Sequence, residues 1–202
     1  KVVALSTDKA CSPLNFYGAT KLCLEKLFVN SSAIKSKQTN FLVVRYGNVM
    51  GSRGSILDLI KKNRSKKFNL TDTRMTRFHI KIKGAIDMVD YAFQNLYGGE
   101  ILIPKIPSIR IKDLVEAIYG NKNYNIIGIR SGEKIHEMLM AESESYNGYQ
   151  NSKYYLIGEP VKLDKIKKNF KKIKNELSYS SDKNLFLTKK QILSEIKEIL
   201  KK

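Results

Sequence analysis

The sequence lacks long apolar runs and contains two cysteines. No stretch approaches the roughly 18 apolar residues of a membrane-spanning helix and no signal peptide opens the chain, so we expect no membrane segment in it. Cys11 and Cys23 form neither a C-x-x-C pair nor a disulfide framework, which favours a reducing, cytoplasmic setting. Because zinc-type spacings are absent as well, the sequence predicts no metal site.

Negative charge is scarce: 37 Lys and Arg accompany 19 Asp and Glu, giving a formal net charge of +18. Such a balance is typical of proteins that bind nucleic acids, but no recognition-helix pattern and no RNA-binding aromatic signature accompany it. We therefore interpret the lysines, which are densest after Val161, as a solvated basic surface that can attract anionic ligands. We expect no nucleic-acid partner.

The chain also lacks an initiator Met and a G-x-G-x-x-G turn. It begins at Lys1 directly inside an apolar, strand-like run, so we expect it to be the carboxyl-terminal piece of something longer. The glycines of residues 47–54 are spaced G-x-x-x-G-x-x-G, which differs from the dinucleotide-binding pattern. The phosphate-binding turn is accordingly expected upstream of Lys1.

The most informative stretch is residues 6–21. It follows the apolar run 2–5, which predicts a buried strand, and the carboxyl ends of such strands are where open α/β sheets place their ligands. Pro13 and Asn15 are helix start signals, so Tyr17 and Lys21 fall at i and i+4 on one helical face.

The remaining periodicity predicts alternating strands and helices. Strands are expected at 41–46, 100–104 and 126–129, and helices at 55–62, 82–96, 111–119 and 130–140. In the helix at 82–96 the predicted core face carries Ile82, Ile86, Val89, Phe93 and Leu96. Thr188 and Gln191 form a capping box for a last helix. The fold class is α/β, a partial Rossmann-like, doubly wound parallel sheet with a small α/β substrate-binding domain.

Two groups of side chains in residues 6–21 suit sugar chemistry. An ammonium such as that of Lys21 stabilises a phenolate, so that Tyr17 can accept a hydroxyl proton while a cofactor takes hydride. Asp8 and Lys9, next to Thr7, can protonate a leaving hydroxyl and remove a carbon-bound proton. The alternatives are a surface Tyr–Lys pair and a solvent-facing loop.

Several spaced motifs together resemble one family, the UDP-N-acetylglucosamine 4,6-dehydratases, which are extended short-chain dehydrogenase/reductases of the inverting type. The matching segments are residues 6–21, 45–54, 75–78, 130–137 and, in the tail, 178–188. Tyr17 argues against the membrane-anchored retaining relatives, which typically carry Met there. Ser131 stands where relatives often have proline.

The resemblance implies NADP as cofactor, with NAD possible, and a UDP-sugar as substrate. It implies that Tyr17 is the base at the C4 hydroxyl, Asp8 the acid that expels the C6 hydroxyl, Lys9 the base at C5, and that Thr7 hydrogen-bonds the sugar. Lys21 and Val49 would contact the cofactor together with Tyr17. The implied UDP-sugar contacts are Asn48, Arg53, Thr76, Arg77, Arg130 and Glu133. His79 and His136 are interpreted as structural.

The resemblance further implies a homo-oligomer of the full-length protein and a pathway to surface polysaccharide or to pseudaminic acid. The predicted domains are residues 1–51, the carboxyl-terminal half of an NADP-binding domain to which 79–104 return; 52–78 and 105–160, a UDP-sugar-binding domain; and 161–202, a basic helical tail. The alternatives are a UDP-sugar epimerase or reductase, a non-catalytic UDP-sugar-binding or assembly module, and a basic nucleic-acid binder.

Overall fold

The computed structural model describes residues 1–32, 38–52, 54–62 and 67–200. For residues 61, 62, 199 and 200 it describes the backbone alone. The chain forms two compact units. Unit 1 comprises Lys1–Gly47, Lys83–Lys105 and Met138–Ser180, and unit 2 comprises Asn48–Ile82, Ile106–Glu137 and Ser181–Lys202.

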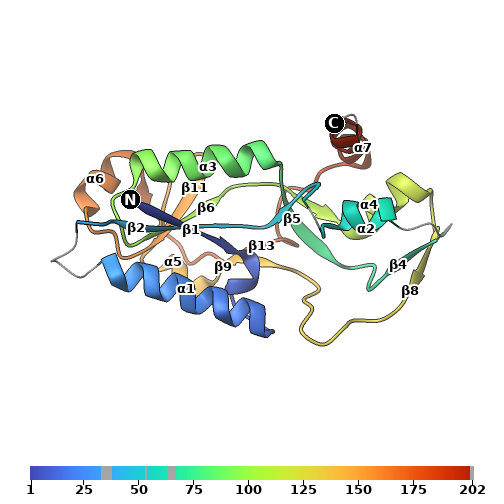
Figure 1. Cartoon of the computed structure of the whole chain (residues 1–202), viewed down its shortest axis with the longest axis horizontal. Helices are drawn as coiled ribbons and strands as arrows, with labels where there is room; N and C mark the ends of the chain where they lie inside the picture. Colours follow the sequence, from blue (N-terminus) through green and yellow to red (C-terminus); the bar gives the residue numbers. More distant parts are fainter. Residues whose placement is uncertain (33–37, 53, 63–66, 201–202) are drawn as a thin grey trace. The chain divides into compact units, whose positions relative to one another are not determined.

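Unit 1 is built on a six-stranded mixed sheet of order β1-β2-β6-β11-β10-β12 (Figure 1). The strands β1 (Val2–Thr7), β2 (Phe41–Tyr46) and β6 (Glu100–Pro104) are parallel. Their near-continuous apolar sequences suit strands that are covered on both faces. The antiparallel half consists of β11 (Tyr154–Gly158), β10 (Tyr149–Gln150) and β12 (Lys171–Lys172). The α/β class is thus confirmed, although only half of the sheet is parallel.

Helices cover both faces of this sheet, as in a doubly wound fold. On one face lie α1 (Phe16–Ser32) and the short α5 (Glu142–Ser145); on the other lie α3 (Ile82–Asn95) and α6 (Leu163–Asn169) (Figure 1). The core on the α3 face joins side chains from β2, β6, β11, α3 and α6.

The predicted core face of the helix at 82–96 was wrong for three of its five residues, whereas Leu96 is buried and Val89 packs against the core. Ala85, Met88 and Ala92 are buried with Leu96, whereas Ile82, Ile86 and Phe93 are at least half exposed. Both faces of the helix are apolar, so periodicity alone could not choose between them. The small side chains of the alanines let the backbone approach the sheet closely, and this favours the observed face.

Unit 2 contains two smaller sheets and three helices. One sheet has the order β3-β5-β7, from Asn48–Val49, Thr76–Ile80 and Ser108–Arg110; the other pairs β4 (Phe68–Leu70) with β8 (Tyr124–Ile126). The helices are α2 (Ile56–Lys62), α4 (Ile111–Tyr119) and α7 (Lys189–Leu200). They bury one core, to which α7 contributes Ile192 and Ile196. The capping box is confirmed, since the backbone N–H of Gln191 donates to Thr188 Oγ1 at 3.3 Å.

The strand predicted at 126–129 and the helix predicted at 130–140 were wrong. The strand ends at Ile126, residues 127–137 are irregular, and Met138–Met140 form β9, which pairs with β13 (Tyr179–Ser180) in unit 1. Gly128 and Gly132 have φ values of +85° and +79°, which neither a strand nor a helix contains. Two left-handed glycines only four residues apart therefore interrupt any regular element.

The predicted domain boundaries also differ from the compact units. Residues 138–160, assigned to the substrate domain, lie in unit 1, because β11 pairs with β6. The predicted tail divides, since residues 161–180 belong to unit 1 and 181–202 to unit 2. These strand pairings join segments that are distant in the sequence, so no local sequence pattern predicts the domain boundaries that depend on them. The functions assigned to the two domains remain predictions.

Candidate active site

The carboxyl end of β1 carries a turn of 3-10 helix, Asp8–Ala10, with Thr7 as its N-cap. Thr7 Oγ1 donates to Asp8 Oδ1 at 2.8 Å and accepts from the Lys9 backbone N–H at 3.4 Å. Lys9 Nζ donates to the same Asp8 oxygen at 3.2 Å. Asp8 Oδ1 thus accepts hydrogen bonds from both of its sequence neighbours, Thr7 and Lys9.

The other oxygen of Asp8 is exceptional. The residue is 0% exposed, and Oδ2 has no hydrogen-bond partner among the described residues. Leaving a buried carboxylate oxygen unsatisfied is costly, and such atoms call for an explanation such as a catalytic role. The arrangement suits a carboxyl group whose second oxygen serves a ligand.

Helix α1 brings Tyr17 and Lys21 to the same strand end. Asn15 begins the helix as predicted, since its Oδ1 accepts from the Gly18 N–H at 2.9 Å. Lys21 Nζ donates to the carbonyl of Leu5, in β1, at 3.0 Å and lies 6.0 Å from the centroid of the Tyr17 ring. Tyr17 itself is 52% exposed, so its phenol is accessible.

Gly18 explains how α1 approaches the turn so closely. A Cβ atom at this position would lie 2.3 Å from the carbonyl oxygen of Lys9. Only glycine allows the helix and the turn to pack in this way. The structure therefore brings Thr7, Asp8, Lys9, Tyr17 and Lys21 together in unit 1.

Tyr46 belongs to this neighbourhood and was missed. It ends β2 and is paired in register with Thr7. Burial raises the pKa of the Tyr46 phenol, and the charge of Tyr17 adds to the effect. The Tyr46 phenol therefore stays neutral at physiological pH. The signal that could have found it is the parallel alignment of two strands that end in polar residues.

A buried ionic network lies behind the turn and was also missed. Arg45 of β2 donates from Nε to Glu25 of α1 at 2.8 Å, and from Nη1 and Nη2 to Glu144 of α5 at 2.9 and 2.8 Å. Ser6 donates to Glu25 at 2.6 Å, and Cys11 lies 3.6 Å from Glu144. The network thus connects both ends of the turn to α1, β2 and α5.

The charges within the network support one another. Burial alone would lower the pKa of Arg45, but hydrogen bonds and charges from Glu25 and Glu144 outweigh burial and raise it. Burial would likewise raise the pKa of Glu144, but Arg45 keeps it below its usual range. An arginine within an apolar strand was the available sequence signal.

In unit 2, Asn48 and Val49 form β3 and line a small cavity of about 20 Å³ together with Arg77 and His79. Asn48 Oδ1 and His79 Nδ1 are buried and have no hydrogen-bond partner among the described residues. The cavity is large enough for one water molecule that could satisfy them. His79 Nε2 contacts Glu195 of α7, which agrees with a structural interpretation of this histidine.

Thr76 and Arg77 are held by contacts within unit 2. Thr76 Oγ1 lies 2.8 Å from His136 Nδ1 and 2.7 Å from Ser181 Oγ. Arg77 Nη1 donates to the carbonyl oxygens of Thr76 and Ile135 at 2.7 and 3.0 Å. Both residues are mostly enclosed, and their role toward a substrate remains a prediction.

Arg130 and Glu133 are brought together in one turn. The Arg130 N–H donates to Glu133 Oε2 at 3.3 Å, and the Glu133 N–H donates to the Arg130 carbonyl at 3.1 Å. The turn leaves Arg130 exposed. Arg53, the remaining predicted substrate contact, lies outside the described residues.

No cluster of three or more His, Cys, Asp or Glu side chains that could hold a metal ion occurs among the residues described. Nor does the described part of the chain contain a helix of the length and apolarity that crossing a bilayer requires. The accessible Tyr17 phenol and the Lys21 ammonium, which is anchored on β1, fit a nicotinamide cofactor.

Comparisons with known proteins agree with this chemistry. The family model described as "Polysaccharide biosynthesis protein" matches residues 1–159. A Campylobacter jejuni protein named UDP-N-acetylglucosamine 4,6-dehydratase (inverting) is 45% identical over 210 residues, which cover 97% of this chain and 63% of that protein. A Rickettsia felis protein named UDP-glucose 4-epimerase is 36% identical, covering 99% of this chain and 61% of its own length.

Among solved structures, the X-ray structure of Pen from Bacillus thuringiensis superposes with a TM-score of 0.86 at 34% sequence identity, covering 98% of this chain and 62% of that one. The likeness is consistent with the partial Rossmann-like fold. The chain therefore spans a little over three fifths of the length of these proteins.

Proposed function

The chain belongs to the polysaccharide biosynthesis protein family, and from this premise we propose that it carries the catalytic groups of a nucleotide-sugar 4,6-dehydratase. The substrate is UDP-N-acetylglucosamine, and the product is a UDP-4-keto-6-deoxy sugar with inversion at C5. The single observation that carries the proposal is the buried Asp8 carboxylate, shared with Thr7 and Lys9 on one side and without a partner on the other.

Two residues act at C4. The phenolate oxygen of Tyr17 accepts the proton of the C4 hydroxyl, and the ammonium of Lys21 stabilises the phenolate. NADP, where it is bound, supplies the hydride acceptor and donor of the cycle. The contact between Lys21 and the Leu5 carbonyl fixes the ammonium beside Tyr17.

Asp8 and Lys9 remove water between C5 and C6. The neutral amine of Lys9 takes the proton from C5, and the carboxyl of Asp8 gives its proton to the C6 hydroxyl, which leaves as water. The pair begins this step as neutral acid and neutral amine and ends it as an ion pair. Because Lys9 Nζ lies 3.2 Å from Asp8 Oδ1, the proton that Lys9 took from C5 can pass directly to the Asp8 carboxylate. This transfer restores the neutral acid and the neutral amine. Inversion at C5 follows when the proton that Lys9 removes is replaced by a proton delivered to the opposite face of the sugar ring.

Unit 2 supplies the residues proposed for the UDP moiety. The guanidinium groups of Arg77 and Arg130 suit a diphosphate, and the carboxylate of Glu133 suits ribose hydroxyls. Val49 is proposed to contact the cofactor, and Asn48 the sugar nucleotide. A cytoplasmic setting, a homo-oligomer and a place in surface-sugar synthesis, such as that of pseudaminic acid, are part of the same proposal.

The first test is an activity assay. The chain is incubated with NADP and UDP-N-acetylglucosamine, alone and with the part of the Campylobacter jejuni relative that it does not match, and the product is followed by NMR. Asp8→Asn and Lys9→Met are expected to lower product formation by about 10²- to 10⁴-fold, the range of general acid–base contributions. The exposed Lys26→Met of α1 serves as the matched control.

The outcomes separate the alternatives. A 4-epimerised sugar that keeps its C6 hydroxyl would indicate an epimerase, since that reaction needs no acid–base pair for loss of water. Binding of UDP-sugar with no turnover in any combination would indicate a binding module. Deuterium uptake at C5 that is lost in Lys9→Met would support the role of Lys9, and the configuration of the product at C5, read from its NMR coupling constants, tests the inversion.

A further inference from the structure

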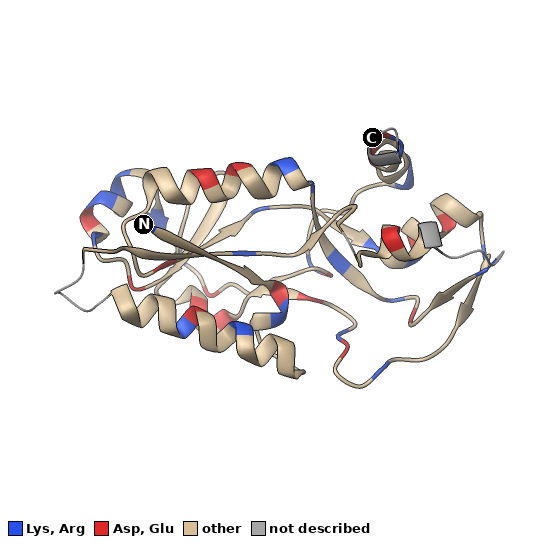
Figure 2. Cartoon of the chain, in the orientation of Figure 1, with Lys and Arg blue, Asp and Glu red and all other residues tan. Residues whose placement is uncertain are grey.

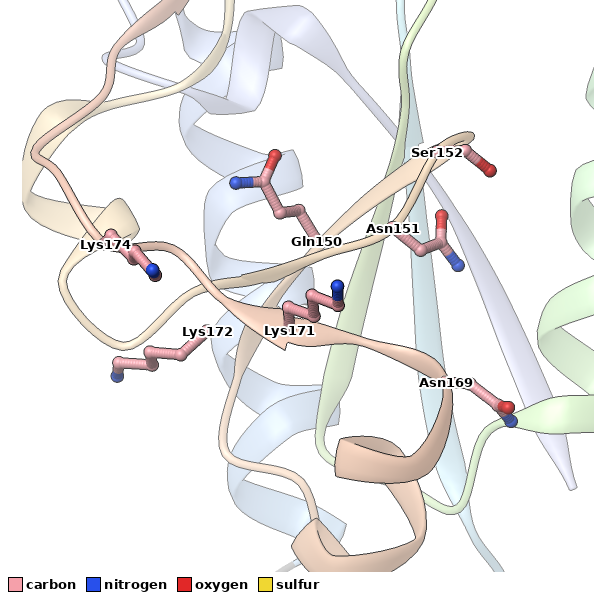
Figure 3. Close-up of a pocket in the computed structure, with 7 residues that line it drawn as sticks. All are labelled: Gln150, Asn151, Ser152, Asn169, Lys171, Lys172 and Lys174. Carbon is pink, nitrogen blue, oxygen red and sulfur yellow. The ribbon is translucent and has the colours of Figure 1, made fainter.

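A cavity of about 430 Å³ lies in unit 1, at the edge of the sheet formed by β12 (Figure 3). We call it the Lys171 cavity. Its lining comes from the turn at residues 150–152, between β10 and β11, from Asn169 at the end of α6, and from Lys171, Lys172 and Lys174. Each lining residue carries an amide, a hydroxyl or an ammonium group, so the lining contains no carboxylate and no aromatic ring, although most of its exposed surface is apolar.

The positive charge of the cavity is not compensated by nearby acids. Among the described residues, Lys171 and Lys174 form no ion pair, while Lys172 lies over the Tyr149 ring at 5.2 Å and 3.5 Å from Asn147 Oδ1. The segment 161–176 holds seven lysines and two carboxylates, and Figure 2 shows the basic residues along α6. Lys171 and Lys172, which are adjacent on β12, extend in opposite directions (Figure 3). The basic segment as a whole attracts anions through its summed charge.

The amide group of Gln150 is oriented to complement an anion. Gln150 pairs with Lys171 in the register of β10 and β12, and its Oε1 accepts from Lys105 Nζ at 2.9 Å. Its carbonyl oxygen is therefore engaged by the protein, which leaves its NH₂ group as the group to donate. Asn151 is fixed in the turn, because its Oδ1 accepts from the backbone N–H groups of Lys153 and Tyr154.

We propose that the Lys171 cavity binds a small anion that carries two or more phosphoryl groups. Its volume lies within the range of about 300–1,000 Å³ typical of small-molecule sites. Lysine ammonium groups and amide donors recognise phosphoryl oxygens, and the absence of an aromatic side chain from the lining leaves no platform for stacking a base.

This site is separate from the candidate catalytic groups. In the sheet, β12 and β1 are opposite edges, five strand spacings apart, which corresponds to roughly 24 Å. The inference therefore does not depend on the proposed dehydratase activity, and a binding measurement can fail or succeed independently of it.

Pyrophosphate is the probe, titrated calorimetrically at constant ionic strength in the absence of any nucleotide. Lys171→Gln/Lys174→Gln is expected to weaken binding by at least about tenfold, as loss of two neighbouring charges implies. The matched control, Lys167→Gln/Lys168→Gln, removes two exposed lysines of α6 that do not line the cavity, and is expected to change binding less than about twofold.

Equal weakening in both double variants would overturn the proposal, because it would show attraction by the general charge of this surface. Absence of pyrophosphate binding to the unmodified chain would do the same. A third arm uses vesicles of phosphatidylcholine with 30% phosphatidylglycerol: binding to vesicles that needs Lys171 and Lys174, without pyrophosphate binding, would assign the lysines to a membrane surface and overturn the small-anion site. Circular dichroism verifies that each variant is folded.

Discussion

Arg45 shows how much depends on one side chain. It is fully buried and is the cation that balances Glu25 and Glu144. Replacing it by Met leaves two enclosed carboxylates without their partner, and breaking a buried ion pair in this way costs about 3–5 kcal/mol. We expect Arg45→Met to lower the free energy of unfolding, measured in urea, by an amount of this order.

The control for Arg45→Met is an exposed ion pair. Lys83 and Asp87 of α3 are 3.0 Å apart, with side chains 83% and 56% exposed. Lys83→Met is expected to change the free energy of unfolding by less than about 0.5 kcal/mol, as surface pairs do. Similar small changes in both variants would contradict the view that the Arg45 network stabilises unit 1.

Glu100 makes stability depend on pH. The residue is 0% exposed at the start of β6. Burial raises the pKa of its carboxyl from 4.5 to about 7. The backbone N–H groups of Tyr97 and Gly98 favour the carboxylate and lower the pKa, but burial has the larger effect. Between these two pH values the folded chain holds a proton that the unfolded chain has lost. Stability therefore falls as pH rises through this window, by about 3 kcal/mol in all.

The test is Glu100→Gln, which cannot ionise. We expect the difference in free energy of unfolding between the variant and the unmodified chain to shift in favour of the variant from pH 5 to pH 8. Urea unfolding at several pH values measures this difference, which cancels groups common to both proteins. Parallel curves across the window would show that the carboxyl of Glu100 titrates normally.

Among the elements, α1 provides a prediction that runs against helix propensity. Gly→Ala within a helix normally stabilises by about 0.5–1 kcal/mol. In Gly18→Ala the new Cβ would meet the Lys9 carbonyl oxygen at 2.3 Å, so the helix or the turn must move. We expect a destabilisation of about 1–3 kcal/mol, typical of overpacking, and a loss of any activity that needs Asp8 and Lys9 beside Tyr17.

Thr20→Ala, at an exposed position of the same helix, is the comparison for Gly18→Ala. It should leave thermal unfolding and activity nearly unchanged. If Gly18→Ala instead raised the unfolding temperature, the close packing of α1 on the turn would be disproved.

Elements with local signals were predictable from the sequence. The strand at 41–46, the helix at 111–119 and the capped last helix are found where apolar period and caps placed them. The strands β10, β12 and β13 were missed because they have two residues each, and β11 was missed because its pairing with β6 joins segments distant in sequence. The positive φ values of Gly128 and Gly132 exclude, respectively, the full strand expected at 126–129 and the helix expected at 130–140.

For the candidate site, too, local groupings were predictable from the sequence, whereas contacts between distant segments were not. The rule that ligands bind at the carboxyl ends of parallel strands grouped residues 7–9 with Tyr17 and Lys21, and the structure places these residues near the end of β1, while their roles remain predictions. The Arg45 network could not be predicted, since Glu144 lies 99 residues from Arg45 in the sequence. Pattern and spacing identify groups within one turn or one helix, whereas buried ionic partners depend on the whole packing of unit 1.

For the whole molecule, the net charge of +18 predicts a dependence of stability on salt. Repulsion between like charges destabilises a compact state, and salt screens it over about 10 Å at 0.1 M. We expect the unfolding temperature to rise by several degrees as NaCl increases from about 20 to about 300 mM, measured by calorimetry.

Replacing four lysines of residues 162–168 by Gln should reduce this salt dependence, because Figure 2 shows the basic residues of α6 close together. An unfolding temperature that stays constant or falls with salt would mean that favourable ion pairs outweigh the repulsion.

The chain passes between its two units five times, and this has a consequence for protein synthesis. The strand β6 leaves the ribosome with Pro104, but its neighbour β11 begins at Tyr154. At about 5–20 residues per second, the apolar edge of β6 waits roughly 3–10 s for its partner. During translation the nascent sheet is thus incomplete, and it is in this interval that a chaperone would have a strand edge to protect.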